Sequence, residues 1–348
     1  MNNRVQNLIA AMKEKGITDV LITDPKNMHY YSGFKNGEGY LLIGDSGFRV
    51  VTDSRYSQYA ADVCKGFEVC DITSNRLSGF LGDGATLGFE DKHMTYAEYV
   101  AISGQVSSLV PIGDMAIRPR EVKDFGEIES ITQAATIADK AFEHMLGVLK
   151  EGITEKQAAA ELECFMKKNG AEKASFDTIV AAGERGSLPH AIASERTLRR
   201  GDLVVMDFGC VVNGYASDMT RTVAIGDVSS SCEDVYNTVL SAQLKALSLI
   251  KSGAIASEVD ASARNIINER YSGRFGHALG HSVGLDIHEA PNLSPKNQNP
   301  LVCGNVVTVE PGIYIPGFCG VRIEDLVVVT DEGYVNLTHS PKELIRIG

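Results

Sequence analysis

The stretch that decides the fold of the C-terminal half of this chain, residues 202–226, reads DLVVMDFGCVVNGYASDMTRTVAIG. Two runs rich in β-branched residues flank Asn213-Gly214, which is the pair that a two-residue type I′ hairpin turn prefers. Such a turn places Val212 opposite Tyr215 and fixes the register of every pair that follows along the two strands. The stretch therefore predicts an antiparallel hairpin, and with it strands that are grouped in sequence.

The hairpin brings two acidic residues together. Its register places Asp207 opposite Thr220, and Asp218 opposite Gly209. Because side chains alternate across a strand, Asp207 and Asp218 then share one face as diagonal neighbours, roughly 7–8 Å apart. Either acid alone would be explained as a turn cap or a solvated residue, but two on one face beside an apolar run repel each other unless a cation lies between them. We therefore expect a metal pair at this face, with the ions roughly 3.5–4 Å apart.

Two further acids lie in a second strand-rich segment, residues 305–328, in apolar surroundings. The irregular loop between these strands leaves their register open. Taken alone, Glu310 is also explained as a strand-end acid before a Pro-Gly turn, and Glu324 as the ion-pair partner of Arg322. Arg322 and Glu324 are two residues apart, so they share a face if this stretch is a strand.

Residues 275–291 form a glycine-rich segment that holds His277, His281 and His288, three of the eight histidines in the chain. Its glycines weaken a helix and let the backbone approach a ligand closely. The pattern does not decide which of the three histidines binds a metal. One imidazole together with the four acids offsets the charge of two divalent cations, so the residues themselves indicate a dinuclear metal hydrolase.

Composition sets limits on the other classes of protein. The chain has 348 residues, long enough for two domains, and its formal charge of −12 argues against general affinity for nucleic acid or anionic membranes. No apolar run approaches the length of a membrane span, and the N-terminal stretch lacks the apolar core of a secretory signal. The seven cysteines are scattered and form no C-x-x-C pair. We therefore predict a reduced, cytoplasmic protein.

The pattern along the chain predicts an α+β fold with two domains, residues 1–122 and 123–348. The first third alternates short strands with helices, as in a small α/β domain, and the charged stretch RPREVKD (118–124) suits a connector. The strands are expected at 19–23, 39–44, 48–53 and 86–91, and the helices at 4–15, 56–64, 96–103, 128–149, 154–168, 231–251 and 257–271.

Five motifs, in their order and spacing, resemble those of the pita-bread metallopeptidases, specifically the Xaa-Pro aminopeptidases and Xaa-Pro dipeptidases (prolidases). They are MDFG (206–209), SDMTR (217–221), GHALGHSVGLDIHEAP (276–291), TVEPGIY (308–314) and GVRIED (320–325). The resemblance extends more loosely to a creatinase-like N-terminal domain through TDPKNMHYYSGF (23–34) and VTDSRY (51–56). It implies a pita-bread catalytic domain behind a smaller α/β domain.

The resemblance also implies a role for each candidate residue. Asp207 would bind one metal, Asp218 and Glu324 would bridge both, and His281 and Glu310 would hold the second. Glu310 would also serve as general base. The remaining candidates would bind substrate, steady the tetrahedral intermediate, shuttle protons or orient Glu324; they are His190, His277, His288 and Arg322.

The implied activity is hydrolysis of the Xaa-Pro bond at the N-terminus of short proline-containing peptides, by a hydroxide held between the metals, in a homodimer. Mn²⁺ is the expected ion, with Co²⁺, Zn²⁺ and Fe²⁺ as alternatives. Some prolidases carry an arginine shortly after the HE-x-P segment, where this chain has Asn292 and Leu293. We therefore favour an aminopeptidase over a dipeptidase. A non-catalytic binding module on the same fold is disfavoured because all five ligand positions are filled, and the N-terminal domain argues against a methionine aminopeptidase.

Overall fold

The computed structural model describes residues 3–73 and 76–348. Packing divides the chain into two compact units, residues 1–120 and 121–348. The domain boundary predicted from sequence follows residue 122, within the connector. Each unit has its own sheets and helices and is described by itself.

Unit 1 is built on a six-stranded mixed sheet with the strand order β4-β3-β2-β1-β5-β6. Strands β1, β2 and β3 form antiparallel pairs, whereas β4 joins β3, and β5 and β6 follow β1, in parallel. The strands are β1 (Asp19–Ile22), β2 (Tyr40–Gly44), β3 (Gly47–Thr52), β4 (Glu68–Asp71), β5 (Thr86–Phe89) and β6 (Ser108–Pro111). The four strands expected here from the sequence are β1, β2, β3 and β5.

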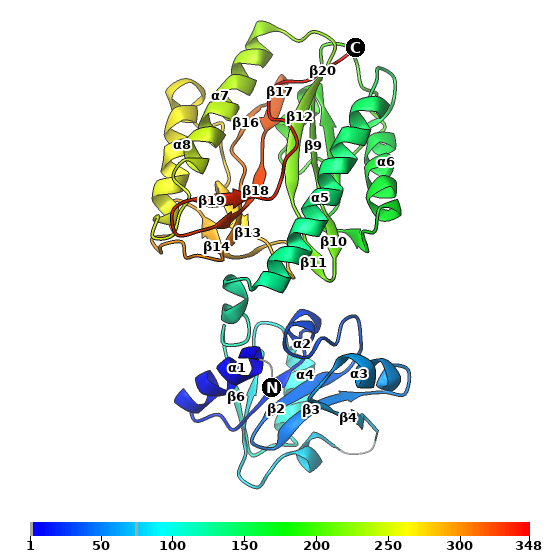
Figure 1. Cartoon of the computed structure of the whole chain (residues 1–348), viewed down its shortest axis with the longest axis vertical. Helices are drawn as coiled ribbons and strands as arrows, with labels where there is room; N and C mark the ends of the chain where they lie inside the picture. The colour runs from blue at the N-terminus through cyan, green and yellow to red at the C-terminus, as the bar shows by residue number, and fades with distance from the viewer. Residues whose placement is uncertain (1–2, 74–75) are drawn as a thin grey trace. The chain divides into compact units, whose positions relative to one another are not determined.

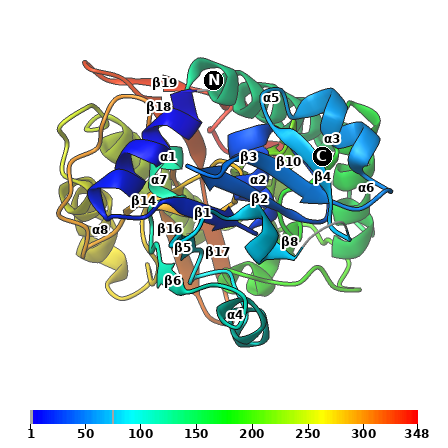
Figure 2. The ribbon, with the colours of Figure 1, turned by 90° about the horizontal axis from the view of Figure 1, so that it is seen from below.

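Helices lie on both faces of this sheet (Figure 2). The short helix η1 (Leu77–Phe80) and α4 (Tyr96–Ser103) cover a small apolar cluster around Leu21 and Leu42 on one face. A capping box of Thr95 and Glu98 starts α4. The other helices of unit 1 are α1 (Asn3–Glu14), α2 (Pro25–Ser32), α3 (Ser57–Val63) and the 3₁₀ turn η2 (Arg118–Glu121).

The predicted hairpin of unit 2 is confirmed. Asn213 and Gly214 have φ angles of 52° and 86°, the left-handed conformations that a type I′ turn needs at both positions. Val212 pairs with Tyr215, and Asp207 pairs with Thr220. The outcome follows from the turn, because its two residues leave one register available.

The hairpin is broken halfway and contributes to two sheets. Its outer half, β10 (Cys210–Val212) and β11 (Tyr215–Ala216), joins the short β7 (Lys173–Ala174). Its inner half, β9 (Leu203–Phe208) and β12 (Met219–Ile225), lies between β8 (Ile179–Ala182) and β20 (Arg346–Ile347). The break falls at Gly209, where an added Cβ would lie 1.9 Å from the Ser217 carbonyl oxygen. Only glycine fits this close approach, which lies beside Asp218.

The remaining strands form a five-stranded and a two-stranded sheet. The first has the order β14-β13-β15-β18-β19, and the second pairs β16 with β17. The strands are β13 (Gly280–Ser282), β14 (Glu289–Leu293), β15 (Val306–Val309), β16 (Gly312–Ile315), β17 (Cys319–Arg322), β18 (Asp325–Val329) and β19 (Tyr334–Asn336).

Two helix pairs flank the strands of unit 2 (Figure 1). Helices α5 (Phe125–Val148) and α6 (Glu155–Lys168) share one apolar core with β8, β9 and β12. Helices α7 (Ser230–Leu247) and α8 (Ala256–Tyr271) share a second core with β15–β18. Two apolar cores therefore enclose the strands from both sides, as expected for an α+β fold.

One expected helix end was wrong. Helix α7 ends at Leu247, four residues before the predicted 251, and continues as a tight turn in which Ile250 N–H donates to the Leu247 carbonyl. Ile250 is buried, so its apolar side chain extended the helical pattern although the backbone had already turned. Among the described residues no helix combines the length and apolarity that a bilayer crossing needs.

Candidate active site

The five predicted metal ligands line one cavity of about 400 Å³ in unit 2. They come from four segments of the chain that are up to about a hundred residues apart, and the strands described above bring them together. The lining residues are Phe176, Asp177, Thr178, Ile179, His190, Ala191, Ile192, Asp207, Asp218, His281, Ile287, His288, Glu310 and Glu324.

Thr220 organises one side of the cluster. Its backbone carbonyl accepts the Glu324 N–H at 3.1 Å, and its hydroxyl donates to the Glu324 carboxylate at 2.7 Å. The same hydroxyl accepts a hydrogen bond from Arg322 Nε at 3.0 Å. Asp207 on β9 lies directly opposite Thr220 on β12. Thr220 is therefore the point at which β9, β12 and the connection between β17 and β18 meet.

His281 and Glu310 form the other side of the cluster. Thr308 on β15 holds both of them, since its hydroxyl accepts the His281 N–H at 3.0 Å and approaches the Glu310 carboxylate at 3.2 Å. His281 Nε2 faces the Glu310 carboxylate at 3.3 Å and the Asp218 carboxylate at 3.6 Å. The imidazole therefore points its Nε2 at the acids.

The acids of this cluster are crowded, and their pKa values show it. Burial, together with repulsion from Glu324, Asp207 and Glu310, raises the pKa of Asp218 above its ordinary range. Burial also raises the pKa of Glu310, to about 8. The pKa of Glu324 is raised by burial and then by repulsion from Glu310 and Asp207. Without a cation among them, these three carboxyl groups are therefore harder to ionise than ordinary ones.

Two observations show that the residues fit divalent metal ions. Asp207 Oδ1 and Glu324 Oε1 are buried and have no hydrogen-bond partner in the described part of the chain. Asp218, His281 and Glu324 each offer a ligand atom, and these atoms all lie within 4.8 Å of one another. Buried acceptors without donors are uncommon unless an ion or water satisfies them, and carboxylate oxygens with one imidazole are ligands typical of first-row divalent metals.

The tautomer of His281 suits the same role. Its Nδ1 lies 3.2 Å from the Ser282 carbonyl oxygen, which can only accept, so Nδ1 carries the proton and Nε2 is free to bind a metal. Burial, followed by the nearby His288, lowers the pKa of His281 to about 4. The ring is therefore neutral at physiological pH, as a metal ligand must be.

The three other candidate histidines, His190, His277 and His288, differ in their positions. His190 and His288 are exposed residues that line the cavity, and the His288 ring lies 4.4 Å from that of His281. His190 belongs to a loop that the buried Glu155 anchors by accepting the Ala182 and Ser194 N–H groups at 2.9 and 3.0 Å.

His277 does not line the cavity but lies behind it. Its Nδ1 donates to the Ala278 carbonyl, and its Nε2 accepts from the Tyr314 hydroxyl at 2.9 Å. That hydroxyl accepts from Arg322 at 2.8 Å, and Arg322 also donates to the Asp207 carboxylate at 2.5 Å. A continuous hydrogen-bonded chain thus joins Asp207 to His277. The Thr220 hydroxyl links Arg322 to Glu324, since it accepts from Arg322 Nε and donates to the Glu324 carboxylate.

Three of these residues, Thr220, Thr308 and Tyr314, were not among the sequence candidates. Thr220 had a signal, since the hairpin register placed it opposite Asp207 and on the face of Asp218. The positions of Thr308 and Tyr314 depend on the pairing of β15 to β18, which the sequence left open. Their hydroxyl groups become recognisable only after the strands are placed.

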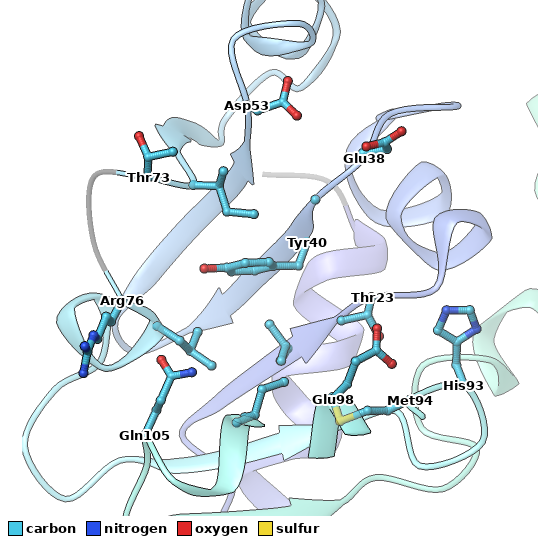
Figure 3. Close-up of a pocket in the computed structure, with 15 residues that line it drawn as sticks. Thr23, Glu38, Tyr40, Asp53, Thr73, Arg76, His93, Met94, Glu98 and Gln105 are labelled. Atoms are coloured by element: carbon cyan, nitrogen blue, oxygen red, sulfur yellow. The ribbon is translucent and has the colours of Figure 1, made fainter. Parts of the chain in front are cut away.

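A larger cavity, of about 840 Å³, lies in unit 1, where Figure 3 shows the Tyr40 ring across its middle. Its acids already have partners. Glu38 and Asp53 each bind Arg55 at 2.6 Å, and the Glu98 carboxylate accepts the Thr95 N–H at 2.8 Å. Residues of the described chain form no cluster of metal ligands here, in contrast to the cavity of unit 2. Size alone therefore does not identify the reactive site.

The fold and the acidic cluster of unit 2 define a metal-dependent hydrolase. Residues 129–331 match the model of metallopeptidase family M24, and residues 4–122 match that of the creatinase/prolidase N-terminal domain. The chain belongs to metallopeptidase family M24, whose members depend on divalent metal ions. The predicted family, fold class and type of enzyme, a metallo-exopeptidase, are confirmed.

The similar proteins include both Xaa-Pro dipeptidases and an X-Pro aminopeptidase. The chain is 40% identical to an Xaa-Pro dipeptidase of Pyrococcus furiosus, over 99% of this chain and 100% of the relative. The structure of an Xaa-Pro dipeptidase from Bacillus anthracis matches with a TM-score of 0.95 and 40% identity, covering 99% of both chains. An X-Pro aminopeptidase from Thermotoga maritima matches with a TM-score of 0.92 and 37% identity, covering 99% of this chain and 100% of that one.

Proposed function

We propose that this protein is a dinuclear metal-dependent Xaa-Pro dipeptidase that releases proline from dipeptides. The observation that carries the proposal is the cluster of Asp207, Asp218, Glu310, Glu324 and His281 in one cavity, in a chain that is similar over 99% of its length to proteins named Xaa-Pro dipeptidase. This choice reverses the preference for an aminopeptidase drawn from the sequence, because the relatives favour the alternative.

The proposed ligand roles are those that the resemblance to known metallopeptidases implies, and the positions of several atoms support them. Asp207, tied to Arg322 through one carboxylate oxygen, offers its buried Oδ1 to one ion. Asp218 and Glu324, whose ligand atoms and that of His281 all lie within 4.8 Å of one another, would contact both ions. His281 Nε2 and Glu310 would complete the second site. When bound, such ions polarise a carbonyl and lower the pKa of a water molecule.

The side chains around the cluster would move and hold the protons. Glu310, whose pKa is raised, is suited to accept a proton from the attacking water and to return it to the departing proline nitrogen. That nitrogen belongs to a tertiary amide and must be protonated before it leaves. His190 and His288, which line the cavity, are placed to donate hydrogen bonds to the substrate and to the oxyanion that develops during attack. His277 would act indirectly, through Tyr314 and Arg322.

An Xaa-Pro aminopeptidase is the second candidate, and one observation favours it. None of the described residues that line the cavity is Lys or Arg, so this lining provides no Lys or Arg side chain for the free carboxylate of a dipeptide. The side chain of Arg322 is 4% exposed and already binds Asp207, Tyr314 and Thr220. The 37% identity to the X-Pro aminopeptidase of Thermotoga maritima agrees with this candidate.

One experiment separates the two activities. Metal-stripped protein is reloaded with Mn²⁺, the expected ion, and assayed in parallel on an Xaa-Pro dipeptide and on the matching Xaa-Pro-Yaa tripeptide. Cleavage that favours the dipeptide supports the proposal, and cleavage of the tripeptide alone establishes the aminopeptidase. Failure to cleave either peptide with Mn²⁺, Co²⁺, Zn²⁺ or Fe²⁺ refutes both. Glu310→Gln is the control, since it retains the shape of the side chain without the proposed base.

The cytoplasmic location and the homodimer stay predictions. Size-exclusion chromatography with light scattering at several protein concentrations tests the homodimer.

A further inference from the structure

A buried ion pair lies outside the cavity, behind its two neighbouring histidines. Lys123 Nζ lies 3.1 Å from the Glu289 carboxylate and 2.7 Å from the Ser282 hydroxyl. The side chains of Lys123 and Glu289 are only 1% and 4% exposed. Ser282 directly follows the ligand His281, and Glu289 directly follows His288, so the ammonium group joins the two segments that carry these histidines.

The pair bridges an irregular point in the strand pairing. His281 pairs with Asn292 in the register of β13 and β14, but the next residue, Ser282, pairs with Glu289. Two residues of β14 are thus left outside the ladder, and hydrogen bonding between the strands does not by itself fix their separation here. Lys123 contacts both members of the displaced pair.

The connection between the two strands depends on the same carboxylate. Glu289 Oε1 accepts the Asp286 N–H at 3.0 Å, and its carboxylate packs over Gly284, where an added Cβ would lie 2.6 Å from Oε2. The Gly284 carbonyl in turn accepts the Ala216 N–H at 2.8 Å, two residues before Asp218. The residues between the strands include Ile287 and His288, which line the cavity, so the Glu289 carboxylate supports part of the cavity wall.

The base of the lysine is also fixed. The Lys123 N–H donates to the Gly304 carbonyl at 2.9 Å, and Gly304 precedes β15, the strand that leads to Glu310. Gly304 has a φ of +88°, and an added Cβ there would lie 2.9 Å from Val122. Asp124, the next residue, caps α5. The ammonium group therefore extends from a backbone held on both sides.

Burial of such a pair is costly. Removing a lysine and a carboxylate from water carries a desolvation penalty that their attraction does not reliably repay, so a buried pair is weak evidence for stability. An apolar pair of the same volume would fill the space as well. The ammonium group adds two directed hydrogen bonds that fix one relative arrangement of β13 and β14.

We propose that Lys123 is a positioning residue that, by joining Ser282 to Glu289, sets the distance and orientation between His281 and His288. This inference rests on the proposed function, in which His281 binds a metal and His288 contacts the substrate. Lys123 is not among the residues that line the cavity, so it would act on the site through Ser282 and Glu289.

The test is Lys123→Met, which keeps the length of the side chain and removes its charge and donors. Loss of a supporting contact of this kind typically costs 10–100-fold in metal affinity or activity. We expect the Mn²⁺ dissociation constant, measured by isothermal titration calorimetry, to rise by about that factor. We also expect kcat to fall by about 10–100-fold with KM within about threefold of the unchanged protein, because misplaced histidines mainly affect the transition state. Lys123→Arg, which retains a charged donor, should recover part of both losses.

A double-substitution cycle shows whether the two residues act as a unit. If they do, Lys123→Met combined with Glu289→Gln binds Mn²⁺ no more weakly than Lys123→Met alone, within about threefold. Additive losses would show separate roles and would overturn the proposal. Should Lys123→Met fail to fold, Glu289→Gln carries the test, since a wild-type Mn²⁺ dissociation constant and kcat in that variant would contradict the inference.

Leu162→Ala is the matched control for general destabilisation. Leu162 is fully buried in α6, in the core shared with β8 and β9, and its truncation leaves a cavity without touching β13 or β14. We expect a lower melting temperature with an unchanged Mn²⁺ dissociation constant. If Leu162→Ala loses Mn²⁺ affinity and kcat to the same extent as Lys123→Met, the role of Lys123 is only to stabilise the fold. If the unchanged protein cleaves no Xaa-Pro peptide, the proposed function fails, yet the Mn²⁺ measurements still decide the role of Lys123.

Discussion

Removing the metal ions should make the stability of this protein fall as the pH rises. Glu310 has an ordinary pKa of 4.5, which burial raises to about 8 in the folded protein. Between these values the metal-free folded state holds a proton that the unfolded chain has already released. The unfolded state therefore binds fewer protons, and the free energy of unfolding decreases with pH. The full contribution is present below pH 4.5 and is lost as the pH passes about 8.

The expected size of this effect follows from the pKa change. Each unit corresponds to about 1.4 kcal/mol, so Glu310 alone accounts for about 5 kcal/mol over this window. Its side chain is 15% exposed, and solvent that reaches it weakens the effect, so we expect about 3–5 kcal/mol. Asp218 and Glu324, whose pKa values are also raised by burial, act in the same direction.

Burial lowers the pKa values of His277 and His281 to about 4, so these two groups change stability in the opposite sense below about pH 6.5. Urea unfolding of EDTA-treated protein at pH 7, 7.5 and 8, above that range, therefore measures the contribution of the acids. The metal-free protein should lose stability at each step, whereas added Mn²⁺ should stabilise it more as the pH rises, because the ligands must be deprotonated to bind. In the metal-free protein, Glu310→Gln should reduce the dependence of the free energy of unfolding on pH, because the contribution of Glu310 is removed. A metal-free protein whose stability stays constant or increases from pH 7 to pH 8 would refute the account of crowded carboxylates.

Three other substitutions test a proposed metal ligand, the hairpin turn and the hydrogen-bonded chain to His277. Asp218→Asn should weaken Mn²⁺ binding by at least about 100-fold and abolish cleavage, while the metal-free protein keeps or gains thermal stability because one crowded carboxylate is gone; calorimetry showing unimpaired binding would contradict its proposed contact with both ions. Gly214→Val forces a β-branched residue to a φ of 86° and should lower the free energy of unfolding by about 1–3 kcal/mol in urea titrations, and no loss would contradict the turn assignment. Tyr314→Phe breaks the link between Arg322 and His277, so kcat should fall about tenfold at unchanged Mn²⁺ affinity, and a wild-type kcat would remove His277 from the mechanism.

The parts of the fold that sequence could predict are those with local signals. The Asn213-Gly214 turn determines one register, and that register alone placed Asp207 opposite Thr220. Helix α6 was predicted because Thr154-Glu155 signals a helix start and Gly170 a helix end. In the structure Thr154 caps the helix, in a capping box with Gln157, and Gly170 has a φ of +105°. Such features depend on a few adjacent residues and need no tertiary information.

The remainder of the site depends on contacts that the sequence does not reveal. Glu310 and Glu324 lie at the ends of β15 and β17, where the chain passes between two sheets, and alternation within a strand carries no signal for such a passage. The different positions of His281, His277 and His288 relative to the acids depend on the shifted register beside Ser282. That register is supported by Lys123, which is 159 residues away in sequence. Resemblance to known proteins chose His281 as the metal ligand, and its Nε2 faces the Asp218 and Glu310 carboxylates, but periodicity alone could not have made that choice.

The most direct test of the dinuclear centre is anomalous X-ray diffraction from crystals of the protein loaded with Mn²⁺. We expect two anomalous peaks within the cluster, roughly 3.5–4 Å apart, with Asp218 and Glu324 in contact with both and His281 Nε2 in contact with one. A single peak, peaks elsewhere in the chain, or peptide cleavage that persists after complete removal of the metal would contradict it.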